Sequence, residues 1–334
     1  MVCVYSARTT ESGVVSTSNY EARKYGVRAG IPIARAKKLL ESTNAVFLPM
    51  NRPLYESISQ RIMDLAESHG DAFEKAGIDE AYLDVSKASS GAYHAARTIA
   101  SNLKQVIFSE EHITCSVGIA PNKLLAKIAS DCAKPNGLTV VNPEQIQEFL
   151  SGPVNKIPGI GTKVEERLKQ LGVQSVDELA RLNPITLQDA FGRSLGSYLF
   201  RAARGEDDEP VRERVLPTQL SRISTLKMNT SDFHIIRPVL KELTQSVTEK
   251  VKEKEMSCKS VSIIAILSDM TIHTRSTTLE PATADSRLIH EVSERLMQQF
   301  LDSDPQAVLR RVGVKLSGLS SLSGQTNIKA FLSN

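Results

Sequence analysis

A length of 334 residues exceeds what one ordinary hydrophobic core holds, so we expect two or more domains. With 41% hydrophobic and 24% charged residues, the composition is that of a soluble globular protein and argues against extended disorder. The formal net charge of +3 is compatible with a nucleic-acid partner but does not require one. No apolar stretch is long enough to cross a bilayer, and the first residues do not resemble a signal peptide. We therefore expect a cytoplasmic protein without a membrane partner.

The four cysteines form no C-x-x-C motif, and the histidines show no ligand spacing, so neither a zinc site nor a disulfide framework is indicated. The first part of the chain predicts two short strands and then helices, which together make a small helical subdomain. The expected strands are 1–5 and 14–17, and the expected helices are 19–25, 33–40 and 52–68.

Residues 72–141 alternate between strand and helix patterns, which indicates helices packed on one sheet. The strands are expected at 78–85, 113–120 and 138–141, and the helices at 92–109 and 122–133. A helix at 143–150 follows, and from 157 to about 210 the chain reads as helical. The polar stretch 211–221 predicts a linker. Beyond it lies a second α/β unit. It is expected to open with a strand that carries Arg222 and Lys227, followed by helices at 235–254 and 286–301 and strands at 261–268, 272–278 and 309–316.

Asp79 and Glu80 stand side by side in an otherwise apolar expected strand. Alternation would turn Asp79 toward the covered face with Leu83, and Glu80 to the opposite side with Tyr82. A buried ionised carboxylate is costly unless it is paired or bound to metal. For an isolated Asp-Glu pair, a position at a strand end in water is the more common explanation, so the dipeptide alone is weak evidence.

Three blocks of sequence give this pair its context: 18–32, Ile78–Asp84 (IDEAYLD) and 116–137 (SVGIAPNKLLAKIASDCAKPNG). Together and in this order they resemble the conserved blocks of Y-family DNA polymerases of the DNA polymerase IV (DinB) type. The resemblance implies an α/β (α+β) right-hand fold with palm, fingers, helical thumb and little finger. The implied domains are fingers 1–51 with a remnant of the N-terminal palm, palm 52–141, thumb 142–210, linker 211–221, little finger 222–320 and a clamp-binding tail 321–334.

The resemblance also implies roles for individual residues. Asp79 and Glu80 are similar to the palm carboxylates that bind two Mg²⁺ ions, which activate the primer hydroxyl and stabilise the leaving pyrophosphate. The incoming triphosphate would be bound by Thr17, Tyr20, Arg23 and Lys134, since a guanidinium fork and hydroxyls suit a polyphosphate. An Arg and a Tyr on a helix are otherwise ordinary surface residues.

Gly13, Val14 and Gly30 match positions that roof the templating base pair in this family. Small residues there leave room for a bulky lesion and check the pair's shape weakly, so the implied function is low-fidelity translesion DNA synthesis, a mutator activity within DNA repair and replication. Primer-template DNA and dNTPs are the implied partners, and we expect a monomer.

Pro158-Gly159-Ile160-Gly161-Thr162-Lys163 before an amphipathic helix predicts a helix-hairpin-helix motif. Gly159, Gly161 and Lys163 would present backbone N–H groups and a positive charge to a DNA phosphate. A simple tight turn between helices is the alternative. In the last unit, expected to follow duplex DNA, six basic residues could contact phosphates or be solvated surface charges. They are Arg222, Lys227, Arg275, Arg310, Arg311 and Lys315.

The tail fits the sliding-clamp peptide pattern of Gln, two spacers, an aliphatic residue, two spacers and two bulky apolar residues. Gln325, Ile328, Phe331 and Leu332 would be its anchors in a groove of the clamp.

The chain departs from the family at its start. Family members begin with a strand that carries an aspartate of the metal site, but residues 1–10 contain no Asp or Glu, and 1–6 align with the next strand. A palm sheet without that central strand would have two unpaired edges. Either the sequence starts internally and the full protein is an ordinary polymerase, which we favour because the other site residues are present, or the chain is a catalytically impaired DNA- and clamp-binding protein. A palm-type nucleotide cyclase is a third reading, disfavoured by the DNA-binding motifs.

Overall fold

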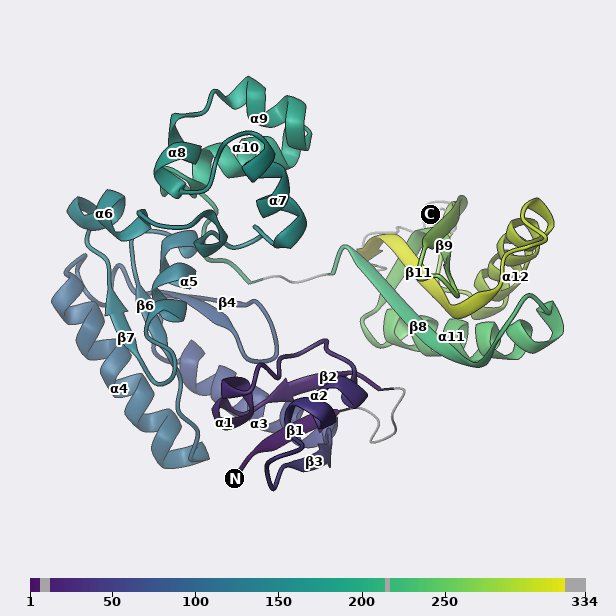
Figure 1. The fold of residues 1–334 in the computed structure, drawn as a ribbon, viewed down its shortest axis with the longest axis horizontal. Coiled ribbons are helices and arrows are strands. Elements are labelled where there is room, and N and C mark those ends of the chain that lie inside the picture. The colour runs from purple at the N-terminus through teal and green to yellow at the C-terminus, as the bar shows by residue number, and fades with distance from the viewer. Residues whose placement is uncertain (7–12, 214–216, 322–334) are drawn as a thin grey trace, which may run out of the picture. The chain divides into compact units, whose positions relative to one another are not determined.

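The computed structural model describes residues 1–6, 13–213 and 217–321, which form two compact units (Figure 1). Unit 1 comprises Met1–Glu213 and unit 2 comprises Arg214–Asn334. Each unit has its own buried apolar core, and each is described by itself.

Unit 1 opens with a three-stranded sheet in the order β2-β1-β3. It consists of β1 (Cys3–Ser6), β2 (Val15–Ser18) and β3 (Val46–Pro49), and it carries α1 (Tyr20–Lys24) and α2 (Ile33–Leu39). Val4 and Val15 from the sheet and Ile33 from α2 meet in a buried cluster. The two strands expected at 1–5 and 14–17 are thus confirmed as β1 and β2, and β3 is a third strand that the sequence did not predict. The sequence signal of β3 is too short to tell from a loop, and its parallel pairing with β1 is what makes it a strand.

The middle of unit 1 holds two separate two-stranded sheets with long helices beside them. One joins β4 (Ala72–Lys75) to β5 (Ala81–Asp84), and the other joins β6 (Val117–Ile119) to β7 (Leu138–Val140). The helices are α3 (Arg52–Glu67), α4 (Tyr93–Glu111) and α5 (Lys123–Cys132). Within the described residues, β5 and β6 each pair on one side only, and every residue of β5, β6 and β7 is partly exposed. The two open strand edges agree with the expectation of unpaired edges in this part of the chain.

A helical bundle follows, as predicted, and closes unit 1. Its elements are the 3₁₀ turns Pro143–Gln145 and Val154–Lys156, α6 (Ile146–Leu150), α7 (Thr162–Gln170), α8 (Val176–Arg181), α9 (Pro184–Phe191) and α10 (Arg193–Ala202). Leu168, Leu179, Leu187 and Leu199, one from each of α7 to α10, are fully buried in one cluster. The cluster extends to Leu125 of α5, so the bundle and α5 share a core.

After α10 the chain returns to the start of α5. The Asn122 amide donates to the Gly205 carbonyl oxygen at 2.7 Å, and the Leu124 N–H donates to Asp207 Oδ2 at 3.1 Å. The segment thus caps the start of α5, where N–H groups lack intrahelical acceptors.

Unit 2 is a four-stranded antiparallel sheet in the order β10-β9-β11-β8. The strands are β8 (Gln219–Thr230), β9 (Met256–Leu267), β10 (Ile272–Thr283) and β11 (Leu309–Ser321), and the helices α11 (Phe233–Glu253) and α12 (Ser286–Ser303) pack on one face (Figure 1). Strand β8 begins inside the range 211–221 that the sequence assigns to a linker, because Leu220 pairs with Leu316 of β11 and packs on the core. In the described part of the chain, no helix is both long and apolar enough to span a membrane.

Candidate functional site

Asp79 and Glu80 lie in the turn of the β4–β5 hairpin, directly before β5, and both are exposed. The amides of Ala76 and Gly77 donate to the Glu80 carbonyl oxygen, each at 3.0 Å, and close the turn. The two carboxylates were expected to alternate within a strand, and this expectation is wrong. Strand β5 starts at Ala81, directly after Glu80, and neither carboxylate side chain is buried. Asp79 forms no ion pair with any described residue.

Glu80 belongs to a row of alternating charges that runs along α5. Its carboxylate forms an ion pair with Lys127, whose Nζ also lies 3.5 Å from Asp131 Oδ2. Asp131 in turn pairs with the predicted phosphate ligand Lys134, with Nζ 2.6 Å from Oδ1. Burial alone would lower the pKa of the Lys127 ammonium, but its hydrogen bonds and charge interactions with Glu80 and Asp131 outweigh burial, and the pKa is raised. The structure thus links a predicted metal ligand to a predicted phosphate ligand.

A second ion pair beside this row is buried. Glu74 of β4 is only 1% exposed, and its Oε2 lies 2.8 Å from Lys123 Nζ at the start of α5. The same ammonium lies 5.7 Å from the centre of the Tyr82 ring. Burial raises the pKa of the Tyr82 hydroxyl. This pair holds α5 against the hairpin and so positions Lys127 near Glu80.

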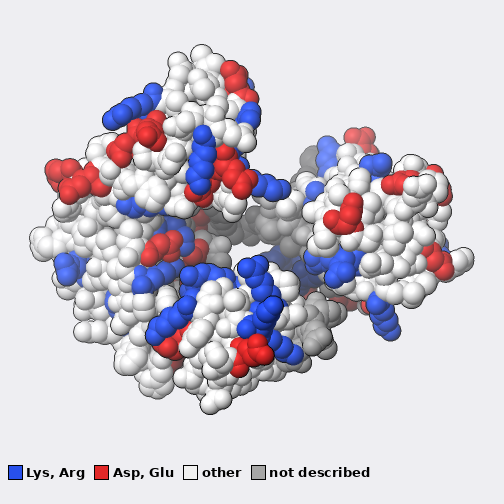
Figure 2. Space-filling view, viewed as in Figure 1, with Lys and Arg blue, Asp and Glu red and all other residues white. Residues whose placement is uncertain are grey.

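The predicted triphosphate residues Tyr20 and Arg23 come together on α1. The Arg23 guanidinium lies 4.8 Å from the centre of the Tyr20 ring, and its Nε donates to the Ser18 carbonyl oxygen at 3.0 Å. Asn19 caps the helix by accepting from Ala22 N and also accepts from Cys3 N, which fixes α1 to β1. Thr17 precedes them on β2 and is exposed. Lys and Arg side chains gather over α1 and α2 on the face shown in Figure 2.

Backbone hydrogen bonds bring the predicted roof residues together. The Ile33 N–H donates to the Gly13 carbonyl oxygen at 3.0 Å, and the Gly30 N–H donates to that of Val15 at 2.8 Å. Gly30 has a φ of +89°, a conformation that favours glycine. Val14 is 54% exposed and offers its side chain to solvent. No hydrogen bond or ion pair of the described residues joins these fingers residues to Asp79, Glu80 or Lys134.

The predicted helix-hairpin-helix segment stands before α7, in front of its N-terminus. Gly159 adopts a φ of +86°, and Gly161 is the residue that precedes the helix. Tyr198 of α10 donates from its hydroxyl to the Pro158 carbonyl oxygen at 2.5 Å and fixes the turn against the bundle. Lys163 lies in the first turn of α7, where the free N–H groups also favour an anion.

In unit 2 the basic side chains divide between the two faces of the sheet. Arg222 donates to Ser246 Oγ of α11 at 3.3 Å, and the Arg275 guanidinium lies 5.6 Å from the Phe300 ring of α12, so both lie on the helix-covered face. Arg311 and Lys315 alternate with buried valines of β11 and therefore lie on the open face. The clamp-peptide residues Gln325, Ile328, Phe331 and Leu332 lie outside the described residues.

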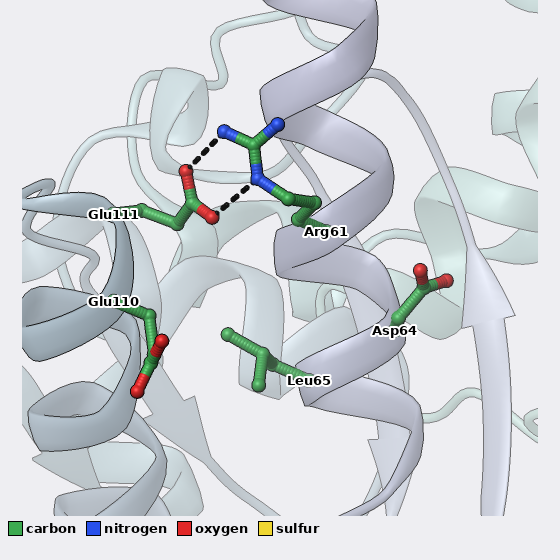
Figure 3. A pocket seen from close by; sticks show the side chains of 5 residues that line it. All are labelled: Arg61, Asp64, Leu65, Glu110 and Glu111. Carbon is green, nitrogen blue, oxygen red and sulfur yellow. Dashed lines mark hydrogen bonds and ion pairs between the residues drawn. The ribbon is translucent and has the colours of Figure 1, made fainter.

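A shallow cleft between α3 and α4 contains none of the predicted site residues (Figure 3). Arg61 crosses it and pairs with both carboxylate oxygens of Glu111, at 2.6 and 2.7 Å. This hydrogen-bonded pair raises the pKa of Arg61 and lowers that of Glu111. The cleft is therefore lined by charged side chains that connect α3 with α4.

Sequence reasoning missed Lys127, Asp131, Lys123 and Glu74. The spacing of Lys127, Asp131 and Lys134 was a usable signal, because residues three and four apart on a helix are neighbours. Their connection to Glu80, and that of Lys123 to Glu74, joins segments almost fifty residues apart and has no local signature.

Known families match most of the chain. The model of the impB/mucB/samB family matches residues 1–131, its C-terminal domain matches 217–328, and a model described as "DNA polymerase-iota, thumb domain" matches 155–207. DNA polymerase IV of Nitrosopumilus maritimus is 41% identical over 332 residues, which cover 99% of this chain and 91% of that protein. DNA polymerase IV of Methanosarcina acetivorans is 39% identical, with 98% and 91% covered.

Solved structures agree with these matches. A chimera of the Y-family DNA polymerases Dbh and Dpo4 superposes with a TM-score of 0.87 at 38% identity, covering 96% of this chain and 92% of that one. An insertion ternary complex of Dbh DNA polymerase has a TM-score of 0.66 at 37% identity, with 96% and 92% covered. The fold and the site together define a right-hand polymerase with a thumb and a tethered C-terminal domain. The chain belongs to the Y family of DNA-directed DNA polymerases, in its DNA polymerase IV (DinB) type.

Proposed function

We propose that this chain extends a DNA primer on a template strand with dNTPs, with low fidelity and past damaged bases, as part of DNA repair. The observation that carries the proposal is the connected charge row Glu80, Lys127, Asp131 and Lys134 beside the exposed carboxylate of Asp79. It puts oxygen ligands for a metal and a cation for phosphates in one exposed place, as nucleotidyl transfer requires. The ternary complex of Dbh supports the choice of DNA and nucleotide as partners.

Polymerases of this family depend on divalent metal ions, and the exposed carboxylates fit Mg²⁺. Mg²⁺ prefers oxygen ligands and is often held by one or two carboxylates together with substrate phosphates. Among the described residues no group of three candidate ligands is present, so the two carboxylates would share the ions with the nucleotide. Asp79 and Glu80 would hold two Mg²⁺ ions. When bound, the ions activate the primer hydroxyl and neutralise the leaving pyrophosphate.

The other residues bind and orient the substrates. Lys134, Tyr20 and Arg23 bind the triphosphate, with Thr17 beside them. Gly13, Val14 and Gly30 form a small-residue roof that leaves the templating base space, because no long side chain extends from this backbone. The turn before α7, with Gly159, Gly161 and Lys163, binds a backbone phosphate of DNA, and the open face of the unit 2 sheet binds further phosphates.

Primer extension with Mg²⁺ and dNTPs tests the proposal. We expect Asp79→Asn to reduce the rate by at least about 100-fold, since removing one stabilising group from a charged transition state commonly costs that much. Asp64→Asn, an exposed change on α3, serves as the control and should leave the rate unchanged. Synthesis by Asp79→Asn at the wild-type rate would show that the metal assignment is wrong.

A second candidate is a catalytically impaired DNA- and clamp-binding protein. Two observations on the described residues favour it: no third candidate metal ligand joins Asp79 and Glu80, and β5 and β6 each have an unpaired edge. Fluorescence anisotropy with a primer-template separates the two proposals, because DNA binding without any extension by the 334-residue chain would establish the second.

We further propose a sliding clamp as partner, bound by a monomer through Gln325, Ile328, Phe331 and Leu332. Two aromatic or aliphatic anchors at the end of a short peptide suit an apolar groove. Phe331→Ala should weaken clamp binding at least about tenfold in calorimetry, and an unchanged affinity would exclude this tail as the contact.

A further inference from the structure

The Lys127 ammonium forms an ion pair with the Glu80 carboxylate, which is one of the two proposed metal ligands. The ammonium pairs with Glu80 Oε1, while Asp79, the neighbouring carboxylate, has no such partner among the described residues. The Glu80 side chain is 46% exposed, so a cation from solvent can reach it, and the Lys127 side chain is 23% exposed. An ammonium and a divalent ion on the same carboxylate repel each other. Lys127 is therefore placed to compete with metal at Glu80.

Asp131 is a second ion-pair partner that Lys127 can reach. It lies one helical turn further along α5, with its Oδ2 3.5 Å from Lys127 Nζ, and it holds Lys134 more closely at 2.6 Å. A phosphate that binds Lys134 removes a cation from Asp131. The Asp131 carboxylate then attracts Lys127 more strongly, because it no longer shares its charge between two lysines.

We propose that Lys127 is a positioning residue that moves between Glu80 and Asp131 and thereby couples metal binding at Glu80 to phosphate binding at Lys134. The proposal rests on the proposed function, and it assigns a role to two residues outside the set of substrate ligands. Charge is balanced in both states. Without ligands the four groups neutralise one another in pairs, and with a metal on Glu80 and a phosphate on Lys134 the middle pair, Lys127 and Asp131, remains neutral.

Direct Mn²⁺ binding to the full chain, without DNA or nucleotide, tests the competition; free Mn²⁺ is measured by electron paramagnetic resonance. Lys127→Met should bind Mn²⁺ about three- to fivefold more tightly, the range expected for losing a partly exposed ion pair. Lys75→Met is the matched control. Lys75 lies opposite Ala81 on the same hairpin and has its Nζ 3.5 Å from Gln60, so it reports the general effect of removing a nearby positive charge. The Mn²⁺ affinity of Lys75→Met should differ from that of the wild-type chain by less than about twofold.

A double-mutant cycle in the same Mn²⁺-binding assay tests the proposed role of Asp131. Asp131→Asn should weaken Mn²⁺ binding, because Lys127 then stays on Glu80, and it should have no effect in the Lys127→Met background. Lys134→Met should tighten binding in the wild-type chain and not in Asp131→Asn. Equal effects of Lys127→Met and Lys75→Met, or an Asp131→Asn effect that persists without Lys127, would overturn the proposal.

Glu80→Gln separates this inference from the proposed function. If Glu80→Gln weakens Mn²⁺ binding while Lys127→Met does not strengthen it, the metal assignment stands and only the competition is wrong. If Mn²⁺ binding is indifferent to Glu80, the metal assignment fails and the coupling fails with it.

Discussion

The sheets of the palm and of unit 2 are built in opposite ways. Strands β5, β6 and β7 have three or four residues each, and all of these are partly exposed. Strands β8 to β11 have 12 or 13 residues each, and β9 and β11 carry rows of fully buried Val, Ile and Leu. Unit 2 thus owes its stability to a core that it completes alone, whereas the palm relies on helix packing and on ion pairs between distant segments. The proposed metal ligands Asp79 and Glu80 lie in the turn that joins two of the short strands, β4 and β5.

The largest expected effect comes from the unit 2 core. Phe300 of α12 is 1% exposed and packs beside the His273 ring and the Arg275 guanidinium of β10, so Phe300→Ala should destabilise unit 2 by about 3–5 kcal/mol. Leu83→Ala in the half-buried β5 should cost only about 1–2 kcal/mol in unit 1. Hydrogen exchange read by mass spectrometry assigns each loss to its unit. A comparable loss from both changes would contradict the contrast between the two sheets.

Breaking the buried palm ion pair should come next. Lys123→Met leaves the Glu74 carboxylate, 1% exposed, without this cation and should cost about 3 kcal/mol. Lys127→Met, on the same helix but in a partly exposed pair, should cost less than about 1 kcal/mol. Urea unfolding followed by circular dichroism measures both. Equal costs would mean that burial does not decide the value of these pairs.

Glycine contacts give a matched test of how closely each sheet is packed. A Cβ at Gly118 of β6 would lie 2.1 Å from the Ala126 carbonyl oxygen of α5, so Gly118→Ala should cost about 2–3 kcal/mol. A Cβ at Gly313 of β11 would lie 2.7 Å from Ile223 Cγ1 and 3.0 Å from the Arg222 carbonyl oxygen, so its closest backbone contact is longer than that at Gly118. Gly313→Ala should therefore cost less than Gly118→Ala, about 1–2 kcal/mol, as thermal unfolding would show. The reverse order would show that β6 yields more readily than β11.

The smallest expected effect is a pH dependence in the thumb. Glu178 accepts hydrogen bonds from Gln174 N at 2.7 Å and Ser175 N at 3.0 Å, and these bonds lower its pKa. A lowered folded-state pKa means that the stabilisation is present above the unfolded value of about 4.3 and is lost as the pH falls through the folded value. Glu178→Gln should flatten this part of the acid unfolding curve of unit 1. An unchanged curve would show that this capping box does not contribute.

Most elements were predictable because their signals are local. The helices of the thumb, α3 to α5 and both helices of unit 2 show apolar residues at helical spacing, and the polymerase blocks named the family. The short strands β3 and β4 were missed, since four residues carry no period that distinguishes strand from loop. The position of Asp79 and Glu80 in a turn was also misjudged, because the hairpin register that starts β5 at Ala81 is set by its pairing with Lys75.

The sequence by itself determined which residues we propose for the chemistry. The carboxylate pair, the Tyr20–Arg23 pair and Lys134 are identified from neighbouring residues, and side chains at helical spacing meet wherever the helix lies. Only the tertiary structure decided what these groups contact. The ion pairs of Lys127 with Glu80 and of Lys123 with Glu74 each join residues almost fifty positions apart in the sequence. The placement of Arg222 and Arg311 on opposite faces of one sheet likewise depends on long-range strand pairing. Chain folding sets these distances, because sequence spacing constrains geometry over one or two helical turns and no further.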